Sequence, residues 1–449
     1  MMRVLFIFLS LFFLSCSVKE KDFSKSLNDT SFLYDNWWKT YENVYLNSFV
    51  DKVLKHNSEI NVARLNLLSA VTRYDLLDLD LYPTLSGNLG LSNSRNLNNG
   101  TKAGFNFSNA LNLSYELDIY GKIRDEIDSA KFSANASAYE LESLKLSLVN
   151  SSVDYVFDLV YFNEVSILLN DYLKNLELSK ELYTIKYNLG KIEELDLLNL
   201  EQSVLNAKQN ILSNEQNKEL IIKNLKDLLG SKSEFKEIEY LDKLRFSDFQ
   251  SKELNFNVPL TYLENRPDIQ SSLNSLKAAF KDVSALEKSI FPSISLGGNL
   301  RGSSTKFDDS FKLMVLNGSA ELSLPFLDYA RVKKNIKLSS LEYEKLKLNY
   351  EQSLQTAINE FLLCKKDYEF YGKLLENIIA INEKQARIKN AYQLKYEAGK
   401  VELKDFLDAQ NNYINSHQEI LRQKLSLLKT QNLYYKITST KFTNDRIAF

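Results

Sequence analysis

Cysteine, histidine, proline and glycine are all scarce in this chain of 449 residues, which has 2 Cys, 2 His, 5 Pro and 13 Gly. The few cysteines and histidines (Cys16, Cys364, His56 and His417) exclude a disulfide framework, a histidine-rich metal site and a Cys/His zinc cluster. The formal net charge of −2 provides no basic excess for nucleic-acid binding. Because Gly and Pro interrupt helices, their scarcity predicts very long helices. We expect no cofactor, no metal and no nucleic-acid partner.

The N-terminus has the pattern of a targeting signal. Arg3 precedes an unbroken apolar run over residues 4–14, which at about 1.5 Å per residue is too short to cross a hydrocarbon core of roughly 30 Å. The run ends in Phe13-Leu14-Ser15-Cys16, which resembles a bacterial lipobox. We predict a lipoprotein signal peptide over residues 1–15, lipidation of Cys16, and a lipidated N-terminal segment over residues 16–57. An ordinary secretory signal that contains a cysteine is the alternative.

Two windows hold nine of the thirteen glycines and show the two-residue alternation of β-strands. The alternating apolar side chains are Leu85, Leu89 and Leu91, then Phe107, Leu111, Leu113, Tyr115, Leu117 and Ile119, and in the second window Ile294, Leu296 and Leu300, then Met314, Leu316, Ala320, Leu322, Leu324 and Phe326. We predict hairpins over about 84–119 and 293–327, with polar loops at 93–102 and 302–310. Long strands with one apolar and one polar face are typical of transmembrane barrels. A soluble sandwich is disfavoured because two hairpins are too few to build one.

The segment between the windows predicts a long coiled helix. Residues 122–189 contain neither glycine nor proline, so at 1.5 Å per residue they could form one helix of about 100 Å. Its apolar and small residues follow a seven-residue repeat, which indicates helices that supercoil against partners. The members of the repeat are Ile123, Ala130, Ser137, Leu144 and Ser151, interleaved with Ile127, Ala134, Leu141, Leu148, Tyr155 and Phe162.

The chain contains an internal two-fold repeat. Segments 58–86 and 267–295 align without a gap at an offset of 209 residues. The matched landmarks are Pro83 with Pro292, Gly190 with Gly399, and Asp196 with Asp405. We therefore predict repeat 1 over residues 58–266 and repeat 2 over residues 267–449, each with a helix, a β-hairpin and long helices.

Four strands per chain cannot close a barrel, and an open edge in lipid leaves unpaired backbone groups that are costly. Oligomerisation is therefore required. Three copies would give twelve strands and a water-filled lumen, whereas two would give eight strands, a size whose interior is largely filled by side chains. The expected fold class is mixed, all-α plus transmembrane β: a trimeric α-barrel/β-barrel channel, to which each chain contributes four strands and long coiled helices.

An ordered set of short motifs gives the sequence its family resemblance. The motifs are Trp37-Trp38, Leu81-Tyr82-Pro83-Thr84-Leu85, Tyr115-Glu116-Leu117-Asp118-Ile119-Tyr120-Gly121-Lys122-Ile123-Arg124, Asn265-Arg266-Pro267-Asp268-Ile269, Phe291-Pro292-Ser293-Ile294-Ser295-Leu296, Tyr396-Glu397-Ala398-Gly399 and Phe406-Leu407-Asp408-Ala409-Gln410. Together they resemble the TolC-like outer-membrane efflux channels, specifically the lipoprotein branch that serves resistance-nodulation-division (RND) multidrug pumps. The second hairpin exit, 324–331, lacks the family's usual glycine, which leaves the strand-to-helix geometry of repeat 2 open.

The resemblance implies a homotrimer in the outer membrane, with a twelve-stranded barrel above a helical barrel that crosses the periplasm. It also implies passive transport, in which an inner-membrane RND pump supplies the energy and a periplasmic adaptor (membrane fusion) protein grips the helical tip. The expected partners are these two proteins and outer-membrane lipid.

The tip residues follow from helix breaks and from the resemblance. Gly190 and Gly399 interrupt helical runs, so each predicts a tight turn between helices. Asp405 and Asp408 are spaced i, i+3 and share a helix face, so in a trimer they would form two carboxylate rings that favour cations. The family match supports this aperture role, against the alternative of a solvated or capping helix face.

The resemblance also implies a gate bond between Asp196 and Tyr396, which occupy the positions of the aspartate and tyrosine that hold the family's closed state. The basic residue that family members often carry two positions after the second glycine is Val401 here. A closed state with fewer bonds, or with Lys400 or Lys404 as substitutes, is our hypothesis.

Passive export of drugs and small amphiphiles is the function that the sequence favours. A type I protein-secretion conduit shares the same fold, and a lipid-anchored coiled-coil rod would leave the four alternating strands unexplained. We do not expect an enzyme, because no paired acid and base and no phosphate loop can be identified.

Overall fold

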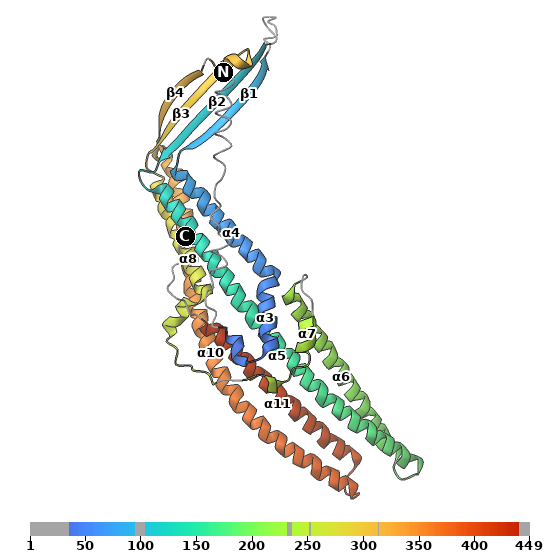
Figure 1. Ribbon diagram of the computed structural model, residues 1–449. Helices are drawn as coiled ribbons and strands as arrows, with labels where there is room; N and C mark the ends of the chain where they lie inside the picture. The colour runs from blue at the N-terminus through green and yellow to red at the C-terminus, as the bar shows by residue number, and fades with distance from the viewer. Residues whose placement is uncertain (1–35, 95–103, 231–235, 251–252, 313, 440–449) are drawn as a thin grey trace.

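The computed structural model describes residues 36–94, 104–230, 236–250, 253–312 and 314–439. The described chain is elongated, with a β-sheet at one end and two helical hairpins at the other (Figure 1). None of its described helices has a stretch long and apolar enough to cross a membrane. The predicted signal peptide and Cys16 lie outside the described residues.

Two successive series of elements have the same order and the same spacing. The first is α4 (Ser58–Asp78), β1 (Thr84–Ser94), β2 (Gly104–Leu117), α5 (Lys122–Asn188) and α6 (Glu194–Leu229); the second is α8 (Pro267–Lys288), β3 (Ser293–Ser304), β4 (Met314–Ser323), α10 (Tyr329–Glu397) and α11 (Leu403–Thr438). The 209-residue offset carries the start of α4 onto that of α8, and both ends of α6 onto those of α11. The predicted duplication is thus present in three dimensions, as are the predicted long helices.

The smaller elements lie mostly around the middle of the helical region. They are η1 (Trp37–Tyr41), α3 (Val44–His56), η2 (Leu79–Leu81), α7 (Lys236–Leu241), η3 (Phe246–Asp248), η4 (Leu260–Asn265), α9 (Phe307–Ser310) and η5 (Pro325–Asp328).

The four strands form one antiparallel sheet in the order β1-β2-β3-β4. Cross-strand partners share a face, so the row Leu85, Leu113, Gly298, Gly318 and the row Gly87, Leu111, Leu300, Leu316 belong to one apolar face. Ser86, Asn112, Asn299 and Asn317 form a row on the opposite, polar face. The two predicted hairpins are confirmed, although β2 ends at residue 117 rather than 119 and β4 at residue 323 rather than 327.

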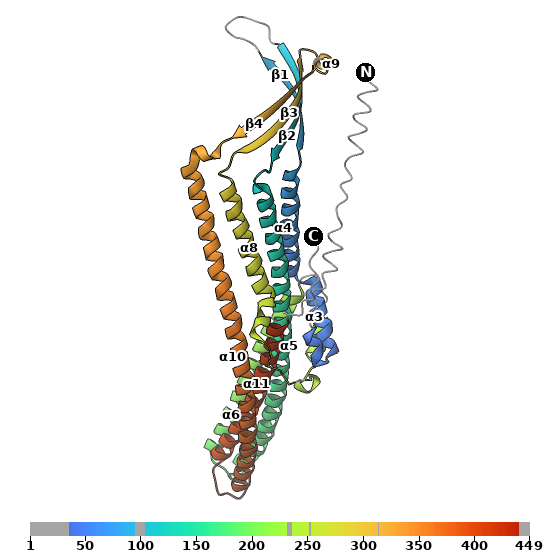
Figure 2. The same ribbon diagram turned by 90° about the vertical axis from the view of Figure 1, so that its left-hand side faces the viewer.

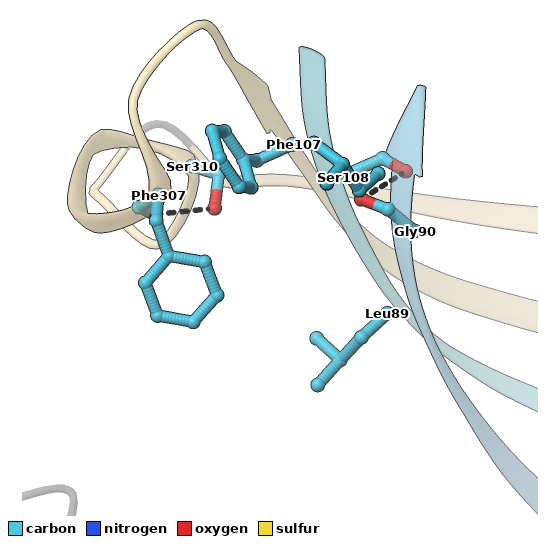
Figure 3. A pocket seen from close by; sticks show the side chains of 7 residues that line it. Leu89, Gly90, Phe107, Ser108, Phe307 and Ser310 are labelled. Carbon is cyan, nitrogen blue, oxygen red and sulfur yellow. Dashed lines mark hydrogen bonds between the residues drawn. The ribbon is translucent and has the colours of Figure 1, made fainter. Parts of the chain in front are cut away.

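The loop predicted at 302–310 is wrong in detail, because β3 continues to Ser304 and residues 307–310 form the short helix α9. The Asn109 amide of β2 donates to the carbonyl oxygen and to Oγ of Ser310, both at 3.1 Å. The Phe107 and Phe307 rings meet edge to face, with centroids 5.8 Å apart. Figure 3 shows Phe107, Phe307 and Ser310 around the hollow between α9 and the strand ends. Contacts with a strand 200 residues away therefore order this loop.

The two strand-to-helix exits differ in construction. In repeat 1, both carboxylate oxygens of Asp118 accept backbone N–H groups at the start of α5, at 3.0 and 3.2 Å, and Gly121 precedes the helix with φ +74°. In repeat 2, the short 3-10 helix η5 begins at Pro325 and leads directly into α10. Proline fixes φ near its helical value and needs no N–H partner at a helix start. The missing glycine of this exit is therefore replaced by a proline-initiated turn.

Beneath the sheet, helices continue the order of the strands. α4 packs on α5, α5 on α8, and α8 on α10, so the layer has the order α4-α5-α8-α10. Figure 2 shows α10, α8, α5 and α4 side by side, in this order, across the upper helical region. The outer members, α4 and α10, form the lateral edges of the layer, below the edge strands β1 and β4.

The main apolar core lies at mid-length, where η1 and α3 pack against α5, α6, α7 and α11. Trp37 and Trp38 are 2% and 1% exposed, and their rings contact each other edge to face at 5.5 Å. Tyr41 and Phe157 extend this contact at 5.1 Å. The Trp37-Trp38 motif is therefore a core anchor that attaches the segment before α4 to the long helices.

A polar network crosses this core. The Trp37 indole donates to Oδ1 of Asn432 at 2.8 Å, and the Asn432 amide donates to Oδ1 of Asp154 at 2.9 Å. Asn150 donates to the other carboxylate oxygen of Asp154 at 3.0 Å. Burial raises the pKa of Asp154 to about 6, although the hydrogen bond from Asn432 acts in the opposite direction.

Replacing Asp154 should remove a pH dependence of stability. Because the folded pKa of about 6 exceeds the ordinary 3.8, the folded chain binds more protons in that interval, and its stability falls as pH rises through it. Asp154→Asn has no charge, so wild type should lose roughly 1–3 kcal/mol relative to this variant between pH 4 and pH 7. Thermal unfolding at both pH values measures the loss.

The control is Asp51→Asn, at an exposed carboxylate of α3, which should change stability equally at both pH values. An equal difference between wild type and Asp154→Asn at the two pH values would contradict the prediction.

Candidate functional site

The candidate site is the helical tip, where both repeats reverse direction by the same turn. Gly190 and Gly399 have φ of +64° and +68°, a conformation that glycine adopts without a Cβ penalty. The N–H of Gly190 donates to the Tyr187 carbonyl at 2.8 Å, and that of Gly399 to the Tyr396 carbonyl at 2.9 Å. The residue after each glycine donates back to the carbonyl five positions earlier at 2.9 Å. Both turns are thus Schellman motifs, and the predicted positions of the tip turns agree with this geometry.

The next helix of each hairpin begins three residues after these bonds, and each has an aspartate in its first turn. Asp196 is the third residue of α6, and Asp405 is the third residue of α11. A carboxylate at this position interacts favourably with the partial positive charge of the helix N-terminus. Asp405 therefore stabilises the start of its helix, whatever further role it has.

The packing of α11 fixes which of its faces is accessible. Leu403 and Leu407 are 2% and 4% exposed, and they pack against α5 and α6 in a cluster with Tyr172, Leu176, Tyr183, Leu200, Val204 and Ala207. Asp405 and Asp408 alternate with these leucines and are both exposed. The two carboxylates thus lie on the solvent-facing side of α11, one helical turn apart.

An aromatic stack joins the two hairpins at the tip. The Tyr183 ring of α5 stacks on Tyr396 of α10, with centroids 6.0 Å apart, and Tyr396 stacks on Phe406 of α11 at 6.3 Å. The Lys186 ammonium lies over the Tyr183 ring at 5.1 Å and 6.0 Å from the Tyr396 centroid. Such cation–π contacts add to the stacking of the rings.

Asp196 acts on this stack from α6. Burial, together with Tyr396 and Asp196, raises the pKa of the Tyr183 hydroxyl well above its usual value. Among the described residues, no hydrogen bond joins Asp196 directly to Tyr396. Sequence reasoning identified Asp196 and Tyr396, named Phe406 only as part of a family motif, and missed Tyr183 and Lys186. The i, i+3 spacing of Tyr183 and Lys186 just before the glycine turn was the available signal.

The hypothesis that lysines substitute for the missing basic residue at Val401 has no support within one chain. Lys400 and Lys404 are exposed, and neither forms an ion pair with a described residue. The Lys400 backbone N–H closes the Schellman turn instead.

The remaining chemically reactive side chains are held in packing roles. Cys364 is 1% exposed, its Sγ lies 3.5 Å from the Thr430 carbonyl oxygen, and burial raises the pKa of its thiol to about 12. His417 lies beside the Tyr413 ring at 6.1 Å, and burial lowers its pKa. No group of three His, Cys, Asp or Glu side chains in the described segments is placed to hold a metal ion.

Comparisons with known proteins identify the family. A family model described as outer membrane efflux protein matches residues 49–231 and 258–438. The chain belongs to the outer membrane efflux protein family. This efflux protein is 31% identical over 402 residues to the toxin and drug export protein A of Aggregatibacter actinomycetemcomitans, a match that covers 89% of this chain and 87% of the relative.

Two further matches agree with this assignment. The efflux protein is 24% identical to the cation efflux system protein CusC of Escherichia coli strain K12, with 89% of each chain covered. Its fold matches the outer membrane channel CmeC of Campylobacter jejuni with a TM-score of 0.82 and 26% identity, over 92% of this chain and 89% of that one. The predicted TolC-like fold class and outer-membrane location are therefore confirmed.

The tip turns should be sensitive to any side chain at their glycines. Gly399→Ala places a Cβ at positive φ and should destabilise this hairpin by about 1–2 kcal/mol. The matched control is Gly372→Ala, because Gly372 lies inside α10 and an added Cβ would meet no atom within 4 Å beyond the adjacent backbone of its own helix. Alanine there should stabilise the helix by about 0.5–1 kcal/mol.

Thermal unfolding followed by the helical circular dichroism signal measures both variants, which should shift in opposite directions. Shifts of the same sign would contradict the assignment of the Gly399 turn.

Proposed function

We propose that this protein is the outer-membrane channel of a tripartite RND-type efflux system, through which drugs and other small amphiphiles leave passively. The observation that carries the proposal is that the sheet and the helical layer have their edges at the same two margins. The four-stranded sheet, with one apolar and one polar face, has β1 and β4 at its edges, and α4 and α10 are the edge helices below them. A homotrimer joins these margins into a continuous wall around a polar lumen.

The other partners follow from the helical length. The hairpins α5–α6 and α10–α11 end far from the sheet (Figure 1). We propose that a periplasmic adaptor protein grips these ends and connects them to an inner-membrane RND pump, which supplies the energy. The protein itself is then a conduit rather than an enzyme. Lipidation at Cys16 would add a membrane anchor to each copy.

We propose that Asp405 and Asp408 line the aperture at the tip. Their exposure and their spacing of one turn on α11 support this placement. A trimer would then carry two rings of three carboxylates at its narrowest point. Clustered carboxylates create a negative potential that attracts cations and repels anions.

Neutralising both rings should weaken cation selectivity. In planar bilayers under a salt gradient, the Asp405→Asn, Asp408→Asn double variant should move the reversal potential toward zero, because the aperture loses its fixed negative charge. The control is the Glu344→Gln, Glu351→Gln double variant, which removes two exposed carboxylates of α10 far from the tip. An unchanged reversal potential in the aspartate variant would refute the ring assignment.

We propose that the aromatic stack of Tyr183, Tyr396 and Phe406 keeps the resting aperture narrow, with Asp196 as the polar partner of the gate. The stack joins α5, α10 and α11 across the two hairpins, so separating the hairpins requires its disruption.

Removing the central ring should open the resting channel. Tyr396→Ala should raise single-channel conductance, because it removes both ring contacts, whereas Tyr396→Phe keeps the stack and should raise it less. The difference between the two variants measures the share of the aromatic ring, and the difference between wild type and Tyr396→Phe measures the share of the hydroxyl group. Equal conductance in wild type and Tyr396→Ala would contradict a gate at this stack.

Export of a protein toxin is the second candidate, because one relative is named a toxin and drug export protein. Cation export is a third, because another relative is named as part of a cation efflux system. Deletion of the gene and measurement of fluorescent-dye accumulation tests the proposal. Raised accumulation supports small-molecule efflux, whereas unchanged accumulation with loss of a secreted protein or with metal-cation sensitivity would replace it.

A further inference from the structure

Charged side chains are rare in the four strands, and they share one face of the sheet. The described strands contain three charged residues, which are Glu116 in β2, Arg301 in β3 and Glu321 in β4. Glu116 and Glu321 both pair with Ser295. Ser295 lies four residues from Asn299 of the polar row, and Arg301 lies two residues from it. Because side chains alternate between the faces of a strand, all three charges belong to the polar face.

These charges lie at two levels of opposite sign. The acidic level is the row Glu116, Ser295 and Glu321, close to the helical end of the sheet. The arginine level is Arg301, six residues further along β3 and toward the end of the sheet that carries α9 (Figure 2). Six strand residues span about 20 Å, which exceeds the Debye length of about 10 Å at 0.1 M salt. An ion that moves along the polar face therefore meets the two levels separately.

The side chain at the arginine level has no partner of opposite charge. Arg301 is exposed, its strand partners are Ala110 and Val315, and it forms no ion pair with a described residue. A guanidinium group stays charged at any physiological pH and presents several N–H donors to a carboxylate, sulfonate or phosphate. Arg301 is thus free to bind an anionic group that passes along the polar face.

Further carboxylates lie close to the acidic level. Glu116 and Glu321 are two strands apart, which places their Cα atoms about 10 Å from each other. In the first turns of α5, burial raises the pKa of Glu126, Lys122 lowers it, and Glu116 and Asp80 raise it again. The influence of Glu116 on Glu126 means that the negative potential of this level extends from the sheet into the start of the helices.

The strand fold itself requires neither charge. The offset of 209 residues relates Arg301 to Ser92 and Glu321 to Asn112, so repeat 1 has uncharged polar residues at the same positions of its strands. The two charges therefore act on something other than strand pairing. Arg301→Ser and Glu321→Asn are accordingly mild replacements, because each introduces the residue that the other repeat already carries.

The helix α9 lies on the opposite, apolar side of the sheet. Asn109, which donates to Ser310 of α9, pairs with Leu89 and Gly302 in a row of the apolar face. A Cβ at Gly302 would come within 1.8 Å of the Ser310 carbonyl oxygen, so α9 covers this face directly. Lys306, the exposed residue before α9, therefore provides a cation at the same end of the sheet as Arg301 but in a loop that folds onto the other face.

We propose that Arg301 determines specificity in the outer part of the lumen, where it binds anionic groups of the permeating compounds, whereas Glu116 and Glu321 attract cations at the helical end of the barrel. This inference rests on the proposed trimeric channel. One arginine and two carboxylates per chain would then give a ring of three guanidinium groups and a ring of six carboxylates. Every simple ion meets one attractive and one repulsive ring on its way through the barrel.

Reversal potentials in planar bilayers test the two levels. Under a potassium chloride gradient at about 0.1 M, Arg301→Ser should shift the reversal potential toward stronger cation selectivity, because a barrier to cations is lost. The Glu116→Gln, Glu321→Asn double variant should shift it in the opposite direction. Arg301→Lys keeps the charge and should leave the potential unchanged, as should Lys306→Ser. At about 1 M salt, where the Debye length is about 3 Å, the shifts should become much smaller.

Block by an organic anion provides a second readout. Naphthalene-1,5-disulfonate, added to each side of the bilayer in turn, should reduce the current through the wild-type channel more strongly from the side that the outer end of the barrel faces. Arg301→Ser should lose this block, and Arg301→Lys should retain most of it. The Asp405→Asn, Asp408→Asn variant, which is altered at the opposite end of the molecule, should be blocked as strongly as wild type.

The outcomes separate this inference from the proposed function. Opposite shifts of the reversal potential, with loss of the anion block in Arg301→Ser, support two rings of opposite sign. A conducting trimer in which Arg301→Ser changes neither the reversal potential nor the block overturns the role of Arg301 and leaves the channel intact. A protein that forms no conducting oligomer overturns the proposed channel as well as the rings.

Discussion

Unpaired backbone groups at the margins of a β-sheet are the constraint on which the architecture depends. β1 and β4 each have one side without a partner strand in the described chain, and in hydrocarbon each unsatisfied N–H or C=O group costs several kcal/mol. No described segment of the same chain covers these margins. In the homotrimer that we propose, a neighbouring copy pairs with each of these margins. The helical layer below the sheet has the same order, since its outer helices α4 and α10 lie below the edge strands β1 and β4.

Two long helices connect the sheet to the tip at the opposite end of the molecule. α5 and α10 run without interruption from the sheet to the tip, so the spacing set by strand pairing also determines how the hairpins approach each other there. The tip has its own apolar cluster, separate from the main core at mid-length. Its cohesion comes from Leu403 and Leu407 against α5 and α6 and from the stack of Tyr183 on Tyr396. Further up, Val165 and Leu169 of α5 pack against Leu421 of α11, so the two hairpins are joined along α5 as well as at the tip.

Sequence reasoning succeeded where local patterns determine structure and failed where distant contacts do. Alternation and glycine placement predicted the strands, and the glycines at 190 and 399 predicted the tip turns, because each signal acts on the backbone within a few residues. The helix α9 was missed because Asn109 and Phe107, which order it, lie about 200 positions earlier in the chain. The network of Trp37, Asn432 and Asp154 likewise joins three distant segments. Neither has a periodic signature.

The two repeats share the residues that determine the backbone conformation but differ in many of their charged residues. Residues that set the backbone are retained, as with the glycine turns and the aspartates at the starts of α6 and α11. Residues that set charge differ: Asp125 corresponds to Lys334, and Asn199 corresponds to Asp408. Lys180–Glu201 and Lys208–Glu177, each at 2.9 Å, join α5 to α6, whereas three of the four corresponding positions in α10 and α11 are Gln410, His417 and Ala386. One fold unit used twice therefore provides two equivalent pieces of wall whose surfaces are distinct, and the second hairpin alone carries an aspartate at both positions, Asp405 and Asp408.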